Sequence, residues 1–110
     1  MKKKILLTGA SGTVGKEVLS QLIDFDCYEI SIVARKHALK QKELKKLLNK
    51  VAFINCDLSR PEDFLKINGQ FDIVIHLAAI IPPLADKKPK LAEAVNTNGT
   101  INLIKQLEKV

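Results

Sequence analysis

The stretch Thr8-Gly9-Ala10-Ser11-Gly12-Thr13-Val14-Gly15 limits the possible folds of this 110-residue chain more than any other segment. It follows a short apolar run, residues 3–8, and precedes a segment with helical periodicity. Gly9 permits a tight turn, Gly12 lets backbone N–H groups approach an anion, and Gly15 lets the following helix pack closely. The N-terminus of that helix offers unpaired N–H donors and a partial positive charge to a phosphate. The pattern therefore predicts a dinucleotide-binding turn rather than a plain turn.

A phosphate loop of the nucleotide hydrolases is the main alternative for this segment. Residues 10–17 nearly match G-x-x-x-x-G-K-[ST], with Gly15 and Lys16 in the required places. However, Ala10 replaces the first glycine, and Glu17 stands where a hydroxyl should bind Mg²⁺. A carboxylate at that position would repel the phosphates, which argues against this alternative.

Short β-branched apolar runs alternate with helical patterns along the whole chain. The runs span residues 3–8, 29–34, 51–55 and 72–77. Their continuous apolar character is typical of parallel strands that are covered on both faces. Helices are expected over residues 12–24, 40–49 and 89–108, with a shorter one near residue 60.

This alternation predicts an α/β fold, a Rossmann-type doubly wound parallel sheet of four βα units with strand order 3-2-1-4. Ligands of such sheets bind beyond the carboxyl ends of the strands, at the switch point between the first and fourth strands. Residues that directly follow the strands are therefore the candidates for a binding site.

Local patterns predict how two of the helices are built. The shorter helix should begin with a capping box formed by Ser59 and Glu62, with Pro61 in its first turn. The first helix should bury one apolar face, consisting of Val14, Val18, Leu22 and Phe25.

Composition sets broad limits on the class of protein. Apolar residues make up 46% of the chain, enough for a packed core, which excludes a disordered chain. Cys27 and Cys56 are too far apart for a C-x-x-C metal or redox pair, and we interpret them as small buried side chains. Residues 2–4 are lysines, but the apolar run after them is too short for a secretory signal or a membrane span. We therefore expect a cytoplasmic protein.

Three further segments complete the pattern begun by the glycines. They are Cys56-Asp57-Leu58, His76-Leu77-Ala78-Ala79 and Val95-Asn96-Thr97-Asn98-Gly99-Thr100. Together the four segments resemble the start of an extended short-chain dehydrogenase/reductase, of the NAD-dependent epimerase/dehydratase group. The resemblance covers the whole chain, and it implies that the chain is the dinucleotide-binding part, residues 1–110, of a longer enzyme.

The resemblance implies a role for several residues, each with a structural alternative. Asp57 would contact the adenine, or it simply turns the chain. Ala78 and Ala79 would pass close to the nicotinamide half, or they permit tight packing. Asn96 would reach the cofactor from the last helix, or it is a solvated or capping residue. His76 is expected to fill the end of its strand rather than to act as an acid or base.

The end of the second strand bears on the choice between NAD and NADP. No Asp or Glu is present there to bind the ribose hydroxyls of NAD, and Arg35 could instead pair with the 2′-phosphate of NADP. We therefore favour NADP over NAD. The complete set of predicted cofactor-binding residues is Gly9, Ser11, Gly12, Thr13, Val14, Gly15, Arg35, Asp57, Leu58, Leu77, Ala78, Ala79 and Asn96.

The catalytic Tyr-x-x-x-Lys pair of the family has no counterpart in this sequence. The single tyrosine is Tyr28, and Ile32 stands four residues later. We identify no catalytic and no metal-binding residue, and we expect no dehydrogenase, epimerase or dehydratase turnover by this chain alone. A non-catalytic regulatory module that senses NAD(P) stays open as the alternative.

Two further classes of partner follow from the apolar and basic segments. The fourth strand, with Ile73, Val74 and Ile75, and the last helix would expose apolar surface, so we expect self-association. The net charge of +6 makes nucleic-acid binding conceivable. No aromatic residue lies among the lysines between Tyr28 and Phe53 to stack on bases, which argues against nucleic acid as a partner. His37, within this basic segment, is interpreted as a surface residue.

Overall fold

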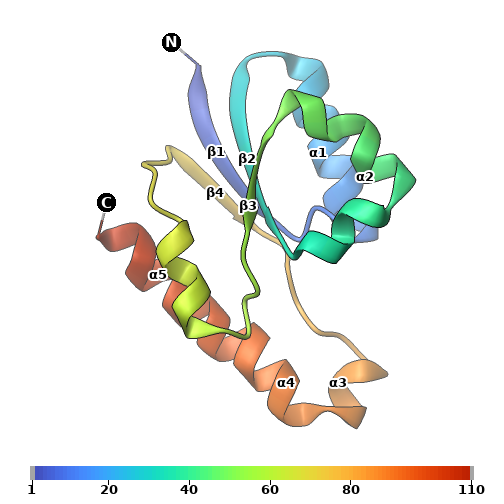
Figure 1. The fold of residues 1–110 in the computed structure, drawn as a ribbon, viewed down its shortest axis with the longest axis vertical. Helices are drawn as coiled ribbons and strands as arrows, with labels where there is room; N and C mark the ends of the chain where they lie inside the picture. The colour runs from blue at the N-terminus through green and yellow to red at the C-terminus, as the bar shows by residue number, and fades with distance from the viewer. Residues whose placement is uncertain (1, 110) are drawn as a thin grey trace.

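The computed structural model describes residues 2–109, apart from the side chains of Leu39 and Glu43. Its centre is a parallel four-stranded sheet of order β3-β2-β1-β4, which confirms the predicted topology (Figure 1). The strands are β1 (Lys3–Thr8), β2 (Tyr28–Ala34), β3 (Ala52–Asn55) and β4 (Ile73–His76). All four lie within one residue or so of the apolar runs that predict them.

Helices cover both faces of the sheet, as the direction of the crossovers requires. The chain steps from β1 to β2 to β3 in one direction and then returns to β4 beyond β1, so right-handed crossovers change faces. One face carries α1 (Thr13–Phe25) and α2 (Lys42–Leu47); the other carries η3 (Pro61–Lys66) and α5 (Thr100–Glu108). In Figure 1, α1 and α2 lie to the right of the strands and α5 to the lower left.

The core consists of two apolar layers that are separated by the sheet. Adjacent residues of β1 point to opposite faces, so Leu6 and Leu7 belong to different layers. Leu7 packs in the layer under α1 and α2, together with Leu19, Ile30, Ile32, Ala38 and Leu44. Leu6 packs in the other layer, together with Val33, Phe64, Ile67, Val95 and Leu103.

The turn between β1 and α1 depends on close backbone contacts. Gly9 has φ +82°, and a Cβ there would lie 2.6 Å from the nitrogen of Ala78. A Cβ at Gly15 would lie 1.7 Å from the carbonyl oxygen of Gly9. The first turn of α1 therefore rests directly on the turn after β1, and only glycine fits at both positions.

This contact also sets the rotation of α1, and it corrects the predicted buried face. Gly15 and Leu19 are the buried residues of the helix, whereas Val14 and Phe25 are 65% and 66% exposed. Val18 and Leu22 pack against the core as expected. The pattern of apolar residues does not predict this buried face, because a glycine, which has no side chain, occupies the centre of the contact.

The segment between β2 and β3 is less regular than the single helix expected there. It consists of the 3₁₀ turn η1 (Lys36–Lys40), α2, and the 3₁₀ turn η2 (Leu48–Lys50). Gln41 separates η1 from α2 with extended backbone angles, φ −72° and ψ 123°. Leu44 is nonetheless fully buried, so the apolar face of this segment still packs against the sheet.

The capping box expected at Ser59 is absent, and this prediction is wrong. The Ser59 hydroxyl donates to Asp57 Oδ1 at 2.7 Å, and Glu62 binds Arg60. Instead, the carboxylate of Asp63 accepts a hydrogen bond from the backbone N–H of Asp57. An Asp that follows a strand readily binds donors two residues later, and this local turn competes with helix capping. The element itself, η3, is a 3₁₀ helix.

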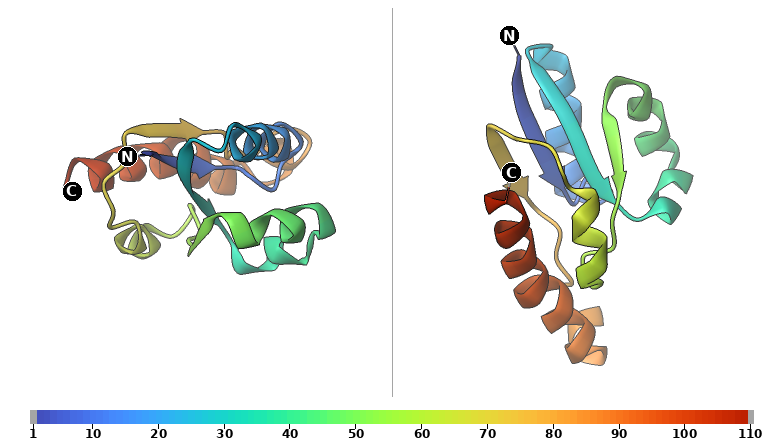
Figure 2. Two further views of the ribbon diagram at one scale, coloured as in Figure 1. Left: turned by 90° about the horizontal axis from the view of Figure 1, so that it is seen from above. Right: turned by 60° about the vertical axis from the view of Figure 1, so that its left-hand side comes forward.

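The expected last helix is continuous, but it contains a π-helical segment. α4 (Pro89–Glu93) leads into η4 (Ala94–Gly99), which is π-helical, and then into α5; a short helix α3 (Leu84–Lys87) comes before them. Figure 2 shows the run from α4 to α5 as one long rod beside the sheet. A Cβ at Gly99 would lie 2.9 Å from the carbonyl oxygen of Leu58, so the rod passes very close to the chain after β3.

Two expectations about surfaces have different outcomes. Within the described residues β4 pairs with β1 alone, and the side chains of Ile73 and Val74 are partly exposed, as the sequence predicts. Ile101 and Ile104 are likewise exposed on α5. Cys56 is buried as expected, but Cys27 is exposed.

We predict that Gly15→Ala destabilises the chain, since the new Cβ overlaps the carbonyl oxygen of Gly9. The expected loss in free energy of unfolding is about 2–3 kcal/mol, typical of overpacking in a close contact. Gly69→Ala is the matched control, because its Cβ would meet only the ring of Phe71 at an ordinary 3.5 Å. Urea denaturation followed by circular dichroism measures both variants. Equal stability of the two would contradict the proposed contact.

Candidate functional site

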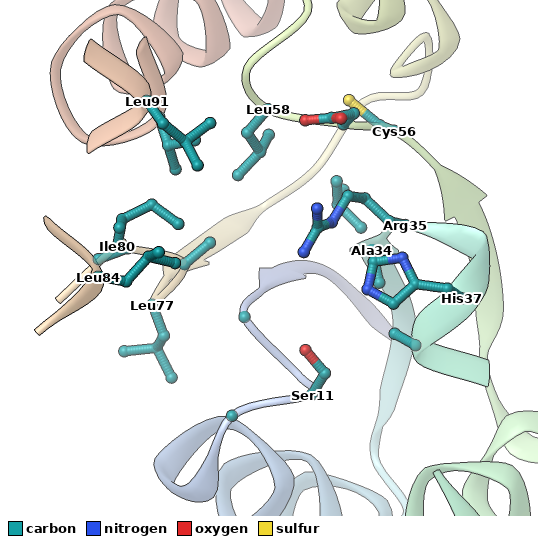
Figure 3. A pocket seen from close by; sticks show the side chains of 18 residues that line it. Ser11, Ala34, Arg35, His37, Cys56, Leu58, Leu77, Ile80, Leu84 and Leu91 are labelled. Atoms are coloured by element: carbon teal, nitrogen blue, oxygen red, sulfur yellow. The ribbon is translucent and has the colours of Figure 1, made fainter. Parts of the chain in front are cut away.

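A pocket of about 280 Å³ lies at the carboxyl ends of the strands (Figure 3). Gly9, Arg35 and Leu77 each follow directly after a strand, and the chain after β3 contributes Asp57. The sheet therefore brings together segments that are far apart in the sequence. Most of the predicted binding residues line this pocket, namely Gly9, Ser11, Gly12, Arg35, Asp57, Leu58, Leu77, Ala78 and Ala79.

The glycine turn forms the floor of the pocket and presents the start of α1. Gly12 is the N-cap residue, and its N–H donates to the carbonyl oxygen of Gly9 at 3.1 Å. No side chain caps this helix, and no acidic residue lies in its first turn. The first backbone N–H groups of a helix have no partner within it, so those of residues 13–15 are available to a ligand or to water. Thr13, Val14 and Gly15 can contribute in this way through their backbone, although these three residues do not line the pocket.

Arg35 and His37 extend into the pocket from the segment after β2 (Figure 3). Arg35 is the N-cap residue of η1, and His37 lies in its first turn. The Ala38 N–H donates to the Arg35 carbonyl oxygen at 2.9 Å. His37 is exposed, as expected, but no sequence pattern placed it in a pocket. The signal that could have identified His37 is its position two residues after Arg35, in the segment that directly follows β2.

Asp57 supplies the only carboxylate among the described residues of the lining. Its Oδ1 accepts hydrogen bonds from the N–H of Ser59 at 2.9 Å and from the Ser59 hydroxyl at 2.7 Å. Partial burial alone would raise the pKa of Asp57, but these bonds and the nearby charges of Arg35 and Arg60 outweigh it, so the pKa is lowered. The carboxylate is therefore charged at neutral pH. Asp57 thus stabilises the turn after β3, as its structural role predicts, and it also lines the pocket.

The other wall of the pocket is apolar. It consists of Leu77, Ile80, Leu84 and Leu91, which lie opposite Arg35 in Figure 3. The pocket is thus charged at one side, where Arg35 and Asp57 lie, and apolar at the other. Such a division suits a ligand that carries both an anionic group and a flat or apolar group.

Cys56 also lines the pocket, but its environment keeps the thiol protonated. Burial, reinforced by the charge of Asp63, raises the pKa of Cys56 to about 11. Since the thiolate is the reactive form of cysteine, Cys56 is not an activated nucleophile. No group of three or more metal-ligating side chains occurs in the part of the chain that is described.

Asn96 lies outside the pocket lining, and its amide group is engaged elsewhere. Oδ1 accepts from the Ile80 N–H at 2.7 Å, and Nδ2 donates to the Ile80 carbonyl oxygen at 2.8 Å. Asn96 therefore ties the helical rod to the chain after β4. A direct contact between Asn96 and a cofactor stays a prediction.

His76 fills the end of β4, as expected from the sequence. The ring is half-buried, and its two nitrogens contact the hydroxyls of Thr8 and Thr100. It does not line the pocket. The sequence did not indicate either of these two threonines as a partner.

Comparison with known proteins finds relatives that match nearly the whole of this chain. The chain is 35% identical to the UDP-glucose 4-epimerase of Vibrio cholerae over 96% of its own length and 31% of the relative's. It is 31% identical to an uncharacterized membrane protein of Methanocaldococcus jannaschii over 93% of its own length and 31% of the relative's. The chain thus spans about a third of the length of the curated relatives it matches. No helix described between residues 2 and 109 has the length and apolar character needed to cross a membrane.

A solved structure and a family model agree with these relatives. The fold superimposes on the L-threonine dehydrogenase of Clostridium difficile with a TM-score of 0.72 and 28% identity, over 98% of this chain and 34% of that one. The model of the 3-beta hydroxysteroid dehydrogenase/isomerase family matches residues 6–109. Together with the glycine turn at the switch point of the sheet, this match confirms the resemblance to extended short-chain dehydrogenases/reductases. The chain belongs to the 3-beta hydroxysteroid dehydrogenase/isomerase family.

Proposed function

We propose that this chain binds a nicotinamide adenine dinucleotide, with NADP preferred over NAD, as the cofactor-binding part of an enzyme of its family. The observation that carries the proposal is the uncapped start of α1, which opens into a pocket lined by Arg35. When bound, such a cofactor donates or accepts a hydride at its nicotinamide ring.

The pyrophosphate would lie over Gly12, at the start of α1. The structure supports this position because a Cβ at Gly12 would meet only one protein atom, the Gly9 oxygen at 3.5 Å. Gly9 and Gly15 are required by contacts within the chain itself, whereas Gly12 is not. The space left by its missing side chain therefore belongs to the pocket, where an anion can approach the backbone N–H groups.

The adenosine half would lie between Arg35 and Asp57. The Asp57 carboxylate could accept a hydrogen bond from the exocyclic amine of adenine, and the hydrogen bonds from Ser59 leave its Oδ2 without a partner among the described residues. Arg35 offers a planar group of donors that matches a phosphate. The nicotinamide half would then lie against Ala78, Ala79 and the apolar wall.

Arg35→Gln tests the preference for NADP. We expect the Kd for NADPH to rise about tenfold, the low end for a charged hydrogen bond because Arg35 is exposed to solvent. The Kd for NADH should change little, since it lacks the 2′-phosphate. Lys46→Gln, which removes another exposed charge outside the pocket, should affect neither. Isothermal titration calorimetry with both cofactors measures these constants, and an unchanged Kd for NADPH in Arg35→Gln would reject the role of Arg35.

Gly12→Ala tests the position of the pyrophosphate. The backbone at Gly12 is extended, with φ −79° and ψ 170°, so alanine fits and the free energy of unfolding should change little. The new methyl group should still block the approach of a phosphate to the helix N-terminus. Loss of one charged hydrogen bond corresponds to an affinity about tenfold lower or more, for NADH and NADPH alike. Full affinity in a stable Gly12→Ala variant would place the phosphates elsewhere.

Self-association through β4 or α5 stays a prediction, supported by the exposed side chains of Ile73, Val74, Ile101 and Ile104. An apolar edge strand is a ready site for pairing between copies. We expect light scattering to give a mass above that of a monomer for the wild type, and a monomer mass for Ile73→Lys. Phe25→Lys, at a more exposed apolar site at the end of α1, should behave as the wild type. A monomeric wild type would count against this surface.

A further inference from the structure

His76 lies at the centre of a chain of hydrogen bonds that the proposed cofactor site does not include. Its Nδ1 is 2.5 Å from Thr8 Oγ1, and its Nε2 is 3.0 Å from Thr100 Oγ1. Thr8 Oγ1 also accepts a hydrogen bond from the Ala78 N–H at 3.2 Å. Thr100 Oγ1 also donates to the carbonyl oxygen of Asn96 at 2.8 Å. The chain of bonds thus connects β1, the segment after β4, and the helical rod.

The positions of the hydrogens follow from the bond to Asn96. A hydroxyl has one hydrogen, and Thr100 gives it to the carbonyl oxygen of Asn96, so His76 Nε2 must carry a hydrogen that it donates to Thr100. In a neutral ring Nδ1 then has none and accepts the hydrogen of the Thr8 hydroxyl. The lone pairs of Thr8 Oγ1 remain free to accept from the Ala78 N–H. Each of the four hydrogen bonds therefore has one donor and one acceptor, and all four run in the same direction, from the Ala78 N–H to the Asn96 carbonyl oxygen.

These hydrogen bonds hold residues 77–80, the segment that crosses the glycine turn. Ala78 is bound at its N–H by Thr8, and Ile80 is bound at both its N–H and its carbonyl oxygen by the side chain of Asn96. Residues 77–80 line the pocket, and they pass close enough to Gly9 to exclude a Cβ there. A shift of this segment would therefore move one wall of the pocket relative to its floor.

We propose that His76 is a positioning residue: as the neutral ring with its hydrogen on Nε2, it orients the hydroxyls of Thr8 and Thr100 and so holds residues 77–80 against the glycine turn. Protonation of Nδ1 would place a second donor opposite the Thr8 oxygen and remove the acceptor of the Thr8 hydroxyl. The geometry of the bonds carries this assignment. Its consequence for dinucleotide affinity rests on the proposed function.

The surroundings of the His76 ring also favour its neutral form. Burial lowers the pKa of His76 from its ordinary 6.5, and no charged side chain of the described residues contributes to the shift. The neighbouring elements, β1 and the helical rod, present the hydroxyls of Thr8 and Thr100 to the ring. Because the folded chain binds this proton less readily than the unfolded chain, the contribution to stability is complete above about pH 6.5 and is lost as the pH falls through the lowered pKa.

Nuclear magnetic resonance of the histidine rings tests the assignment without any ligand. The chain has only two histidines, so His37→Gln identifies the signals of His76. We expect a neutral ring at pH 7, with the nitrogen shifts of a protonated Nε2 and an unprotonated Nδ1. A ring protonated on Nδ1, alone or together with Nε2, would overturn the proposal.

Variants at Thr100 test whether the ring holds the segment. In Thr100→Val the acceptor for Nε2–H is lost, and we expect the Ala78 amide to exchange its hydrogen about tenfold faster, as for one lost hydrogen bond. Thr100→Ser keeps the hydroxyl and should restore slow exchange. Gln106→Leu is the control for general destabilisation, since it removes a bond from α5 to the Ile67 carbonyl oxygen at 2.8 Å and should not affect Ala78 selectively. Unchanged exchange at Ala78 in Thr100→Val, relative to Gln106→Leu, would reject the positioning role.

The affinity for NADPH separates this proposal from the function on which it depends. If the wild type binds, Thr100→Val should raise the Kd about tenfold, by the same loss of one hydrogen bond, and Thr100→Ser should restore it. Altered exchange at Ala78 with an unchanged Kd would overturn the link between the segment and the ligand. If the wild type does not bind, the proposed function fails, while the ring signals and the exchange data still decide whether His76 positions the segment.

Discussion

The contact between Gly15 and the carbonyl oxygen of Gly9 is the constraint on which the rest of the structure depends. It brings the first turn of α1 directly onto the turn after β1, where a side chain has no room. The rotation of α1, and with it the choice of Leu19 as the buried residue, follows from this contact. So does the direction in which the uncapped N-terminus of the helix faces. A single backbone contact thus links the packing of one layer to the electrostatics of the pocket.

Parallel pairing then assembles the pocket from the ends of four strands. Because all strands point the same way, residues 9, 35 and 77 lie at one edge of the sheet, although they are far apart in the sequence. The charged side comes from the segments after β2 and β3, and the apolar side comes from the segment after β4. Hydrogen bonds between threonine and histidine side chains join β1, β4 and the helical rod behind this edge. The site is therefore supported by polar bonds as well as by the two apolar layers.

Particular elements show how far the sequence could predict the fold and the site. Continuous apolar runs located the strands, because a strand covered on both faces needs apolar side chains throughout. The pattern at Ser59 suggested a capping box, but Asp57 took the Ser59 hydroxyl, since both residues belong to the same short turn. The apolar pattern of α1 misplaced Val14 and Phe25, because glycine does not register as part of an apolar face. His37 was missed as a lining residue, since only a 3₁₀ turn directs it toward the pocket.

By itself the sequence determined the order of strands and helices, the strand order of the sheet, and the residues that follow each strand. These properties depend on local periodicity and on the fixed handedness of crossovers, and both can be read along the chain. Tertiary structure alone decided that Asn96 binds Ile80 rather than lining the pocket, that Thr8 and Thr100 flank His76, and that Cys56 is kept protonated. Those features depend on distances between segments up to seventy residues apart in the sequence, and no local pattern encodes them.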